Sequence, residues 1–346
     1  MPKKSKRDAV SPVSTTSHLP LTLADVALRA GVSPITASRA LNRPEMVNRA
    51  TREKVLETVR LMGYVPNLLA GSLASSKSRL VAVLLPTIAH SLFSGTVEAI
   101  MSRLTEAGYQ TLLGPTGYSS EKEEALLEAI LGRRPDGIVL MGSLHTPASR
   151  ARLAAVKVPV VEAWDLSDAP IDMQVGFSHE KVGEHIARHF VAKGYQRFSV
   201  VTVDDPRGRR RCVSLLKHLA ELGIDDVPVE ILPLPATWQV GREGLQRLLK
   251  RTPAPQLVVC SSDTLALGVL AEAASLGLNV PEDIAVLGFG NISEAQYSHP
   301  GLSSIGINAQ QMGREVADAL LDRFSTGHSA HFSLDTGFTL LERSST

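Results

Sequence analysis

Several polar side chains stand beside apolar runs, where they could bind a small molecule. They are the arginine run 207–211, the pair Ser262 and Asp263, and the acids Glu162 and Asp165 near a predicted strand end. A guanidinium suits a carboxylate, which it can grip with two hydrogen bonds, whereas a carboxylate accepts hydrogen bonds from hydroxyls. We expect the arginine run to be exposed, so it could bind an acid or simply form a solvated charge run that caps a helix. Asp263 could accept sugar hydroxyls or cap the helix that begins beside it.

Catalytic motifs are missing around the histidines and glycines of the chain. His179 and His185 are too far apart for the His-Glu-x-x-His zinc motif, and His185 and His189 have no identifiable further metal ligand. The run 288–290 lacks the third glycine of a dinucleotide loop, and there is no Gly-Lys-Ser/Thr phosphate loop and no Gly-x-Ser-x-Gly nucleophile elbow. We therefore expect no enzyme activity, no cofactor and no metal.

Three short helices are predicted near the N-terminus. The first follows Thr22 and ends at Gly31, and the second begins with Ser33 as N-cap and Pro34 at its first position, where a missing N–H costs nothing. A third helix should run over residues 48–62. Two short helices joined by so tight a turn indicate a helix-turn-helix, in which the second helix reads the DNA major groove.

The second helix carries side chains that could contact DNA. Thr36, Ser38 and Arg39 can donate to phosphates or base edges, and Ile35 could touch a thymine methyl group. The hydroxyls could instead cap the helix or face solvent. Residues 1–80 carry 13 Lys or Arg and five Asp or Glu, a net charge of +8, so the remaining residues carry −7. A basic head suggests a polyanionic partner, although a solvated helical face with a basic tail would give the same charge.

From residue 80 onward, apolar runs of strand length alternate with amphipathic helical stretches. Buried runs separated by crossover helices predict parallel sheets with helices on both faces. There are too many units for one sheet, so we expect two doubly wound α/β lobes with a ligand cleft at the carboxyl ends of the strands. The expected strands are 80–85, 109–113, 137–141, 158–161, 198–203, 257–260 and 284–289, and the helices include 93–107, 122–131, 179–192, 209–222 and 264–276.

The chain has no apolar run near the roughly 20 residues that span a bilayer. Its basic N-terminus is followed by Ser, Thr and Pro rather than by an apolar secretory segment, so we expect a cytoplasmic protein without a membrane partner. Cys212 and Cys260 lie in ordinary helix and strand patterns and are expected to be reduced thiols.

Residues 22–42, 51–55 and 61–67 resemble the opening of LacI-family transcriptional repressors. The resemblance continues through the body and implies an all-α helix-turn-helix head fused to a sensor like a periplasmic binding protein. The candidate DNA-binding residues are Thr22, Ser33, Pro34, Ile35, Thr36, Ser38, Arg39, Asn42, Tyr64, Asn67 and Leu73.

A hinge helix is a further expectation from the resemblance. In LacI-family members the segment after a Pro-Asn pair becomes helical on operator DNA, and paired hinge helices insert leucines into the minor groove. The matching segment here is 67–75, and the wedge falls on Leu73. Gly71 and Ser72 are poor helix formers. Such residues are expected in a helix that forms only on DNA, but they are equally expected in a plain linker.

Six short segments resemble the gluconate-utilisation repressors within the family. This narrower resemblance implies that the effector is an aldonic acid or a near relative, such as gluconate, a ketogluconate or a phosphogluconate. The segments are 108–113, 117–118, 145–147, 159–162, 175–177 and 337–340.

The resemblance also implies which residues face the effector. Pro86, Thr87 and Phe93 would line the first-lobe side, although Phe93 could equally be helix core, and Arg211 stands where the family places a basic residue. Ser262 with Asp263 matches the family's polar pair, and Glu162 and Asp165 are similarly placed. Gly290 stands where sugar-binding members often carry an acid, which counts against a neutral hexose.

These observations predict a flexible basic leader over 1–20, a helix-turn-helix domain over 21–66, a hinge or linker over 67–78, and an effector-binding and dimerisation domain over 79–346. We expect a homodimeric repressor that binds a pseudo-palindrome of double-stranded operator DNA and responds to a small sugar acid. The alternatives are the same architecture responding to a neutral sugar or a purine, and a sugar-binding module that binds no DNA.

Overall fold

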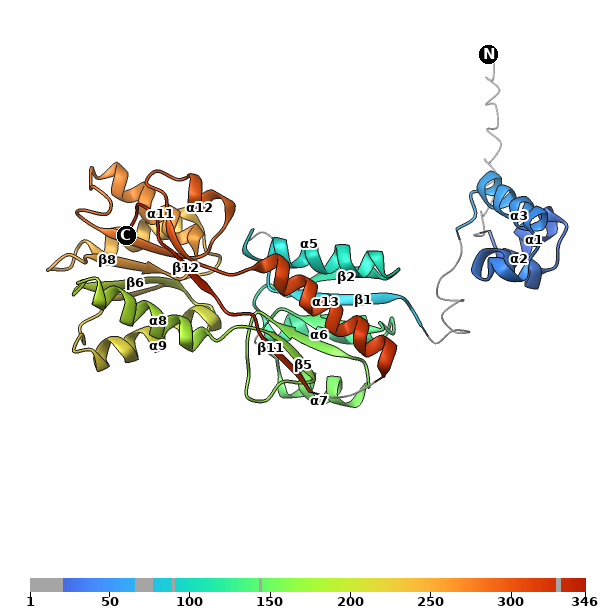
Figure 1. Ribbon diagram of the computed structural model, residues 1–346, viewed down its shortest axis with the longest axis horizontal. Helices are drawn as coiled ribbons and strands as arrows, with labels where there is room; N and C mark the ends of the chain where they lie inside the picture. Colours follow the sequence, from blue (N-terminus) through green and yellow to red (C-terminus); the bar gives the residue numbers. More distant parts are fainter. Residues whose placement is uncertain (1–20, 66–76, 89–90, 143–144, 328–330) are drawn as a thin grey trace, which may run out of the picture. The chain divides into compact units, whose positions relative to one another are not determined.

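The computed structural model describes residues 21–65, 77–88, 91–142, 145–327 and 331–346. The chain divides into two compact units, Met1–Ser76 and Lys77–Thr346 (Figure 1). The leader and the hinge candidates Asn67 and Leu73 lie outside the described residues.

The first unit is a small helical head whose helices begin at polar caps. Thr22 and Asp25 form a reciprocal capping box at the start of α1, and the Ser33 hydroxyl accepts the Thr36 N–H at the start of α2. Gly31 ends α1 with a φ of 63°, a left-handed conformation that favours glycine. The helices are α1 (Leu23–Ala30), α2 (Pro34–Asn42), the short 3₁₀ helix η1 (Pro44–Met46) and α3 (Arg49–Met62).

The second unit contains two lobes, each built on a six-stranded sheet. The first sheet has the order β11-β5-β4-β3-β1-β2, and all its pairs are parallel. Its strands are β1 (Leu80–Leu85), β2 (Gln110–Pro115), β3 (Gly137–Leu140), β4 (Val160–Ala163), β5 (Met173–Gly176) and β11 (Phe332–Asp335), and its helices are α5 (Ser91–Glu106), α6 (Ser120–Leu131), α7 (Pro147–Ala155) and α13 (Ala309–Thr326).

Alternate residues of β1 show why this sheet is covered on both faces. Val81 and Val83 belong to the core shared with α5 and α13, whereas Ala82 and Leu84 belong to the core shared with α6 and α7. Successive side chains of a strand point to opposite faces, so a strand with no polar alternation needs a helical layer on each side.

The second sheet has the order β12-β10-β9-β8-β6-β7. Its edge strand β12 pairs antiparallel with β10, so this lobe is not wholly parallel. The strands are β6 (Phe198–Val203), β7 (Val229–Leu232), β8 (Leu257–Cys260), β9 (Ala285–Gly290), β10 (Ser303–Gly306) and β12 (Thr339–Leu341), and the helices are α8 (His179–Ala192), α9 (Pro206–Glu221), α10 (Trp238–Leu248), α11 (Asp263–Ser275) and α12 (Ser293–Tyr297).

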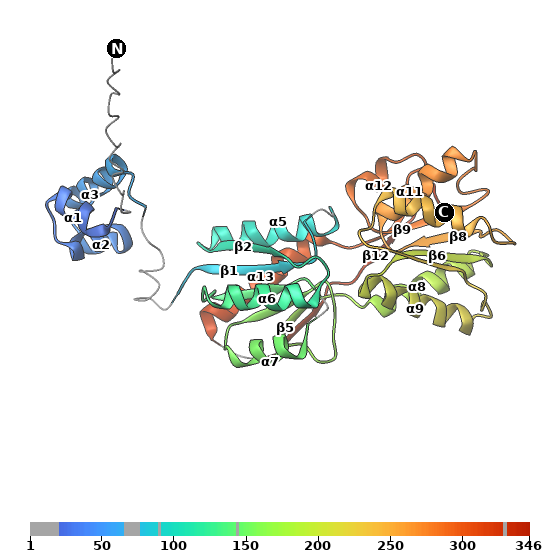
Figure 2. The same ribbon diagram turned by 180° about the vertical axis from the view of Figure 1, so that it is seen from behind.

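The chain passes between the lobes three times, after β5, after β10 and between β11 and β12 (Figure 2). Each lobe is therefore assembled from segments that are distant in the sequence. The predicted class, a helical head with two α/β lobes, is confirmed. No helix among the described residues is long and apolar enough to cross a membrane.

Candidate functional site

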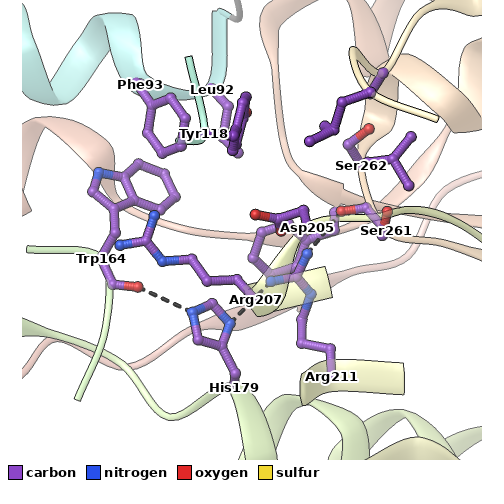
Figure 3. Close-up of a pocket in the computed structure, with 14 residues that line it drawn as sticks. Leu92, Phe93, Tyr118, Trp164, His179, Asp205, Arg207, Arg211, Ser261 and Ser262 are labelled. Carbon is purple, nitrogen blue, oxygen red and sulfur yellow. Dashed lines mark hydrogen bonds between the residues drawn. The ribbon is translucent and has the colours of Figure 1, made fainter. Parts of the chain in front are cut away.

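A cavity of about 50 Å³ lies between the two lobes. Its lining comes from segments that follow β1, β2, β4, β5, β6, β7 and β8 or end β9, so the cavity is at the carboxyl ends of both sheets, where α/β folds bind ligands (Figure 3). The lining residues are Leu92, Phe93, Tyr118, Trp164, His179, Val203, Asp205, Arg207, Arg211, Leu234, Ala236, Ser261, Ser262 and Phe289.

Arg211 is held at the cavity by three contacts. Its Nη1 lies 2.9 Å from His179 Nδ1, its Nη2 donates to the Ser261 carbonyl at 2.8 Å, and its guanidinium lies 3.7 Å from the centre of the Phe289 ring. The cation–π contact and the two hydrogen bonds fix the plane of the guanidinium. Arg211 therefore presents an oriented positive charge at the cavity wall.

The arginine run was expected to be exposed, and this is wrong for two of its members. Arg207 and Arg211 are only 6% and 8% exposed, because they are four positions apart and therefore lie on the same face of α9, which is turned toward the cleft. Arg209 is exposed and pairs with Asp204, whereas Arg210 is only partly exposed.

His179 is a neutral hydrogen-bond relay behind Arg211 (Figure 3). Its Nε2 lies 3.0 Å from the Trp164 carbonyl oxygen, which can only accept, so Nε2 carries the hydrogen and Nδ1 accepts from Arg211. Complete burial and the neighbouring Arg211 hold the pKa of His179 well below its ordinary value of 6.5. The imidazole therefore adds no charge to the site near neutral pH.

The cavity carries a net positive charge. Arg207 and Arg211 both line it, and Asp205 is the one carboxylate among the lining residues. The Asp205 carboxylate already accepts the Gly208 N–H at 2.8 Å as the N-cap of α9. Burial raises the pKa of Tyr118 to about 12, so its phenol is neutral. The site is therefore suited to an anion.

Two other predicted effector residues reach the cavity with Arg211. Phe93 packs edge-on against Trp164 with ring centres 5.1 Å apart, so it belongs both to the cavity wall and to the helix core. Ser262 lines the cavity while its hydroxyl accepts the Leu265 N–H as the cap of α11.

Asp263 does not line the cavity, and it is not the cap of α11, because Ser262 takes that position. One Asp263 oxygen accepts the Ser304 hydroxyl at 2.7 Å and the other accepts the Ile292 N–H at 2.8 Å. Burial raises the pKa of this carboxyl to about 6. Its two bonds join α11 to β10 and to the segment after β9.

The other four predicted residues are also absent from the cavity lining. Glu162 accepts the Ile171 N–H and faces His145, and Asp165 is paired with Arg210. Thr87 lines a separate groove along α5, and Pro86 is buried beneath the turn after β2, where its carbonyl accepts the Gly117 N–H.

Most of the cavity wall was not predicted from the sequence. Each missed residue stands at or just after the end of a strand, so the position of parallel strand ends was the available signal. No residue type marked them out, since aromatic and basic residues in such places also serve as core or surface. The missed polar and aromatic residues are Tyr118, Trp164, His179, Asp205, Ser261 and Phe289, and Arg207 was considered only as a member of the arginine run.

The head presents the second predicted site on α2. Ile35 is 65% exposed, and Pro34 and Arg39 are also exposed. Arg39 forms no ion pair with any residue of the described part of the head, so its charge is available. An exposed apolar side chain beside an exposed arginine is an arrangement suited to a DNA groove.

The hydroxyls of the head have local partners. The Ser33 and Thr36 hydroxyls lie 2.8 Å apart, Asn42 Nδ2 donates to the Ser38 hydroxyl at 3.5 Å, and the Thr22 hydroxyl donates to Asp25 at 2.7 Å. These contacts agree with the capping alternative and leave each hydroxyl some capacity for a further hydrogen bond.

Tyr64 lies in the core of the head with Val26 and Val55 and is only 9% exposed. Any contact that it makes with DNA is limited to this small edge.

A helix-turn-helix unit and a two-lobed unit with a cavity between its lobes define the class of regulators that bind DNA and a small molecule. A profile of bacterial regulatory proteins of the lacI family matches residues 22–67, and a periplasmic binding protein-like domain matches residues 187–346. The HTH-type transcriptional regulator GntR of Pseudomonas aeruginosa is 38% identical over 327 residues, which cover 94% of this chain and 95% of that protein. The chain belongs to the LacI family and is a DNA-binding transcriptional repressor.

Solved structures agree with this assignment. A LacI-family transcriptional regulator from Silicibacter pomeroyi superposes with a TM-score of 0.88 at 32% identity, covering 94% of this chain and 99% of that one. The lac repressor dimer bound to operator and the anti-inducer ONPF gives a TM-score of 0.81 at 27% identity, with coverage of 94% and 99%. These relatives are transcriptional regulators.

Proposed function

We propose that this repressor changes its affinity for operator DNA when a small sugar acid, such as gluconate or a close relative, binds in the cavity between the lobes. The head over 21–66 would read the DNA, the segment 67–78 would act as hinge, and residues 79–346 would bind the effector and dimerise.

The buried arginine pair carries the sugar-acid part of the proposal. Arg207 and Arg211 place two guanidinium groups at one small cavity whose single lining carboxylate already caps a helix. A buried charge is costly unless it is compensated, and a carboxylate is the anion that a guanidinium binds best. A neutral sugar would leave this positive charge unbalanced.

The carbon chain and the hydroxyl groups of such a ligand also have partners in the cavity wall. The aromatic rings of Tyr118, Trp164 and Phe93 form one wall, against which the apolar face of a carbon chain can pack. Asp205 and the Ser261 and Ser262 region supply acceptors on the other wall (Figure 3). The resemblance of six short segments to gluconate-utilisation repressors supports the same class of ligand.

Dimerisation is supported by an apolar groove along α5. The groove has a volume of about 680 Å³, and its wall includes the exposed side chains of Ile88 and Met101 together with Val97 and Leu113. Exposed apolar grooves of this kind often mark an interface between proteins. Two copies joined here would present two heads to a pseudo-palindromic operator.

Effector binding would act by changing how the lobes are arranged and therefore how the two heads are spaced. A coupling of about 1–3 kcal/mol between the two sites, or roughly 5–150-fold in operator affinity, is typical of such linkage. The test has two parts: operator selection from palindromic DNA, followed by anisotropy titrations with and without gluconate.

Calorimetry with the full chain tests the ligand class directly. Gluconate, a ketogluconate, a phosphogluconate and glucose would be titrated into the parent and into Arg211→Ala. We expect an acid to bind the parent, and Arg211→Ala to weaken that acid by about 2 kcal/mol, roughly 30-fold, because a charged hydrogen-bonding partner is lost. Glucose should lose far less affinity.

Arg209→Ala is the matched control, because it removes an exposed arginine from the same helix. Equal losses for acid and neutral ligands in Arg211→Ala would remove its proposed carboxylate role. The absence of heat with every acid would reject the sugar-acid proposal.

A further inference from the structure

Arg207 belongs to the second lobe, but its side chain is bonded to the first. Its Nη1 donates to the Met141 carbonyl at 2.8 Å and its Nη2 donates to the Ala163 carbonyl at 2.9 Å. Met141 directly follows β3, and Ala163 is the last residue of β4. Two directed hydrogen bonds from one guanidinium therefore cross the cleft to neighbouring strands of the first sheet.

The acceptors of Arg207 are main-chain carbonyls rather than carboxylates. Its Nε is buried without a hydrogen-bond partner among the described residues, and the nearest acid oxygen, on Asp165, is 3.7 Å away. Lobe separation would break both of these hydrogen bonds at once. Because the group is buried, salt would screen these contacts much less than it screens a surface ion pair.

A second cross-lobe contact lies on the same edge of the cleft. Arg210, one turn further along α9, binds both carboxylate oxygens of Asp165, at 2.5 and 3.1 Å. Asp165 follows β4 in the first lobe, just beyond the Trp164 that lines the cavity. The first turns of α9 therefore hold the first lobe through two arginines, of which Arg207 is the buried one.

We propose that Arg207 is a positioning residue that clasps the two lobes together, and that this clasp sets how far the cleft is closed in the absence of ligand. The lobes cannot part along this edge without breaking the bonds to Met141 and Ala163. The clasp therefore also limits how fast the effector binds and leaves, and this second consequence rests on the proposed function.

The fork geometry of arginine makes the clasp testable. A lysine keeps the positive charge, but its single ammonium cannot reproduce two parallel bonds from fixed positions. If Arg207 served only as a charge for the ligand, Arg207→Lys would leave the ligand-free cleft unchanged. If Arg207 is a clasp, the same change opens the ligand-free cleft.

Trp164 provides a reporter inside the cleft. The chain has two tryptophans, and Trp238 is 53% exposed on α10 whereas Trp164 is buried in the cavity wall. Trp238→Phe therefore leaves one tryptophan, whose quenching by acrylamide measures access to the cleft. In the ligand-free full chain, Arg207→Lys should raise the quenching constant of Trp164 roughly twofold or more, because the cleft is open in a larger fraction of the molecules.

The control is Arg209→Lys, a matched change on the exposed side of α9, which should leave the quenching constant unchanged. If Arg207→Lys fails to fold by circular dichroism, Arg207→Gln tests the same point, since its amide can still donate to one carbonyl. Quenching equal to that of the parent, in whichever variant folds, overturns the clasp.

Stopped-flow mixing with gluconate separates this inference from the proposed function. Arg207→Lys should speed both association and dissociation of gluconate by about fivefold or more if closure limits both steps. If gluconate binds no form of the protein, the sugar-acid proposal fails while the quenching result still decides the clasp. If gluconate binds and quenching is unchanged in Arg207→Lys, the clasp fails and the sugar-acid proposal stands.

Discussion

At the scale of single residues, one neutral histidine orients one of the two buried arginines. His179 donates its only ring N–H to the Trp164 carbonyl, so its Nδ1 must accept a hydrogen bond from Arg211. The low pKa of His179, caused by its burial and by Arg211, keeps this arrangement through the physiological range. Effector binding should consequently not be controlled by titration of this imidazole near neutral pH.

Arg39 gives the residue-scale prediction for DNA binding. Arg39→Ala should weaken operator binding by about 1–3 kcal/mol if the side chain reads a base, or lower the salt slope by about one unit if it binds a phosphate. The physical reason is that Arg39 is exposed on α2 with no ion pair among the described residues. Anisotropy titrations at several salt concentrations would measure both quantities.

Arg60→Ala is the control for Arg39, because Arg60 is exposed on α3 and already paired with Glu57. Operator affinity and salt slope that match the parent in Arg39→Ala would exclude this residue from the DNA interface.

The sequence could place individual residues only where the neighbouring chain decides their surroundings. Ser262 reaches the cavity because it stands just after β8, which a sequence pattern can reveal, whereas Phe93 lies in the first turn of α5 and was placed at the effector only through the family resemblance. The burial of Arg207 could not be predicted, since its partners Met141 and Ala163 belong to the other lobe. Asp263 was misassigned for the same reason, because Ser304 comes from a strand that was not predicted.

At the scale of elements, the caps of the head are set by short sequences. Thr22 N–H and hydroxyl both donate to the Asp25 carboxylate, at 2.8 and 2.7 Å. These bonds lower the pKa of Asp25 from its ordinary value of 3.8, which means that the ionised form favours the folded head. The contribution is complete above that ordinary value and is lost as the pH falls through the lowered pKa.

Asp25→Asn should therefore reduce the protection of α1 amides against hydrogen exchange at pH 6, with the difference from the parent shrinking toward about pH 3. Mass spectrometry of the full chain, with rates corrected for intrinsic exchange, measures this protection. Glu45→Gln, an exposed acid in η1 outside the cap, serves as control. A difference that stays constant from pH 6 to pH 3 would contradict the charged cap.

The elements that could be predicted are those whose signals lie within a short stretch of sequence. β1 and α8 match their expected bounds because long apolar runs and capping residues mark them in the sequence. β5, β7 and β10 gave no clear pattern because polar residues interrupt their apolar runs, namely Gln174, Glu230 and Ser303 with Ser304, whereas β8 is equally short but wholly apolar and was predicted. β12 pairs antiparallel with β10 across a long stretch of sequence, and no local feature could indicate that pairing.

At the scale of the whole molecule, self-association determines whether two heads can reach two half-sites. Met101→Glu places a charge in the α5 groove and should convert a dimer to monomers, because burying an unpaired carboxylate in an apolar interface is costly. Mass photometry over a range of concentrations should show a dimer dissociation constant raised by about tenfold or more. Operator affinity should fall as the dimer dissociates.

Ala129→Glu, at an exposed position of α6 outside that groove, is the matched control and should remain dimeric. An unchanged dimer in Met101→Glu would show that the α5 groove is not the interface.

The three passages of the chain between the lobes have a consequence for biosynthesis. The first sheet is completed only by β11 and the second only by β12, and both strands follow residue 331. Neither lobe can close its sheet while the ribosome is still translating the residues before them, although the head over residues 21–65 could fold as soon as it emerges. A nascent chain would thus hold a finished DNA-reading head well before it holds a finished sensor.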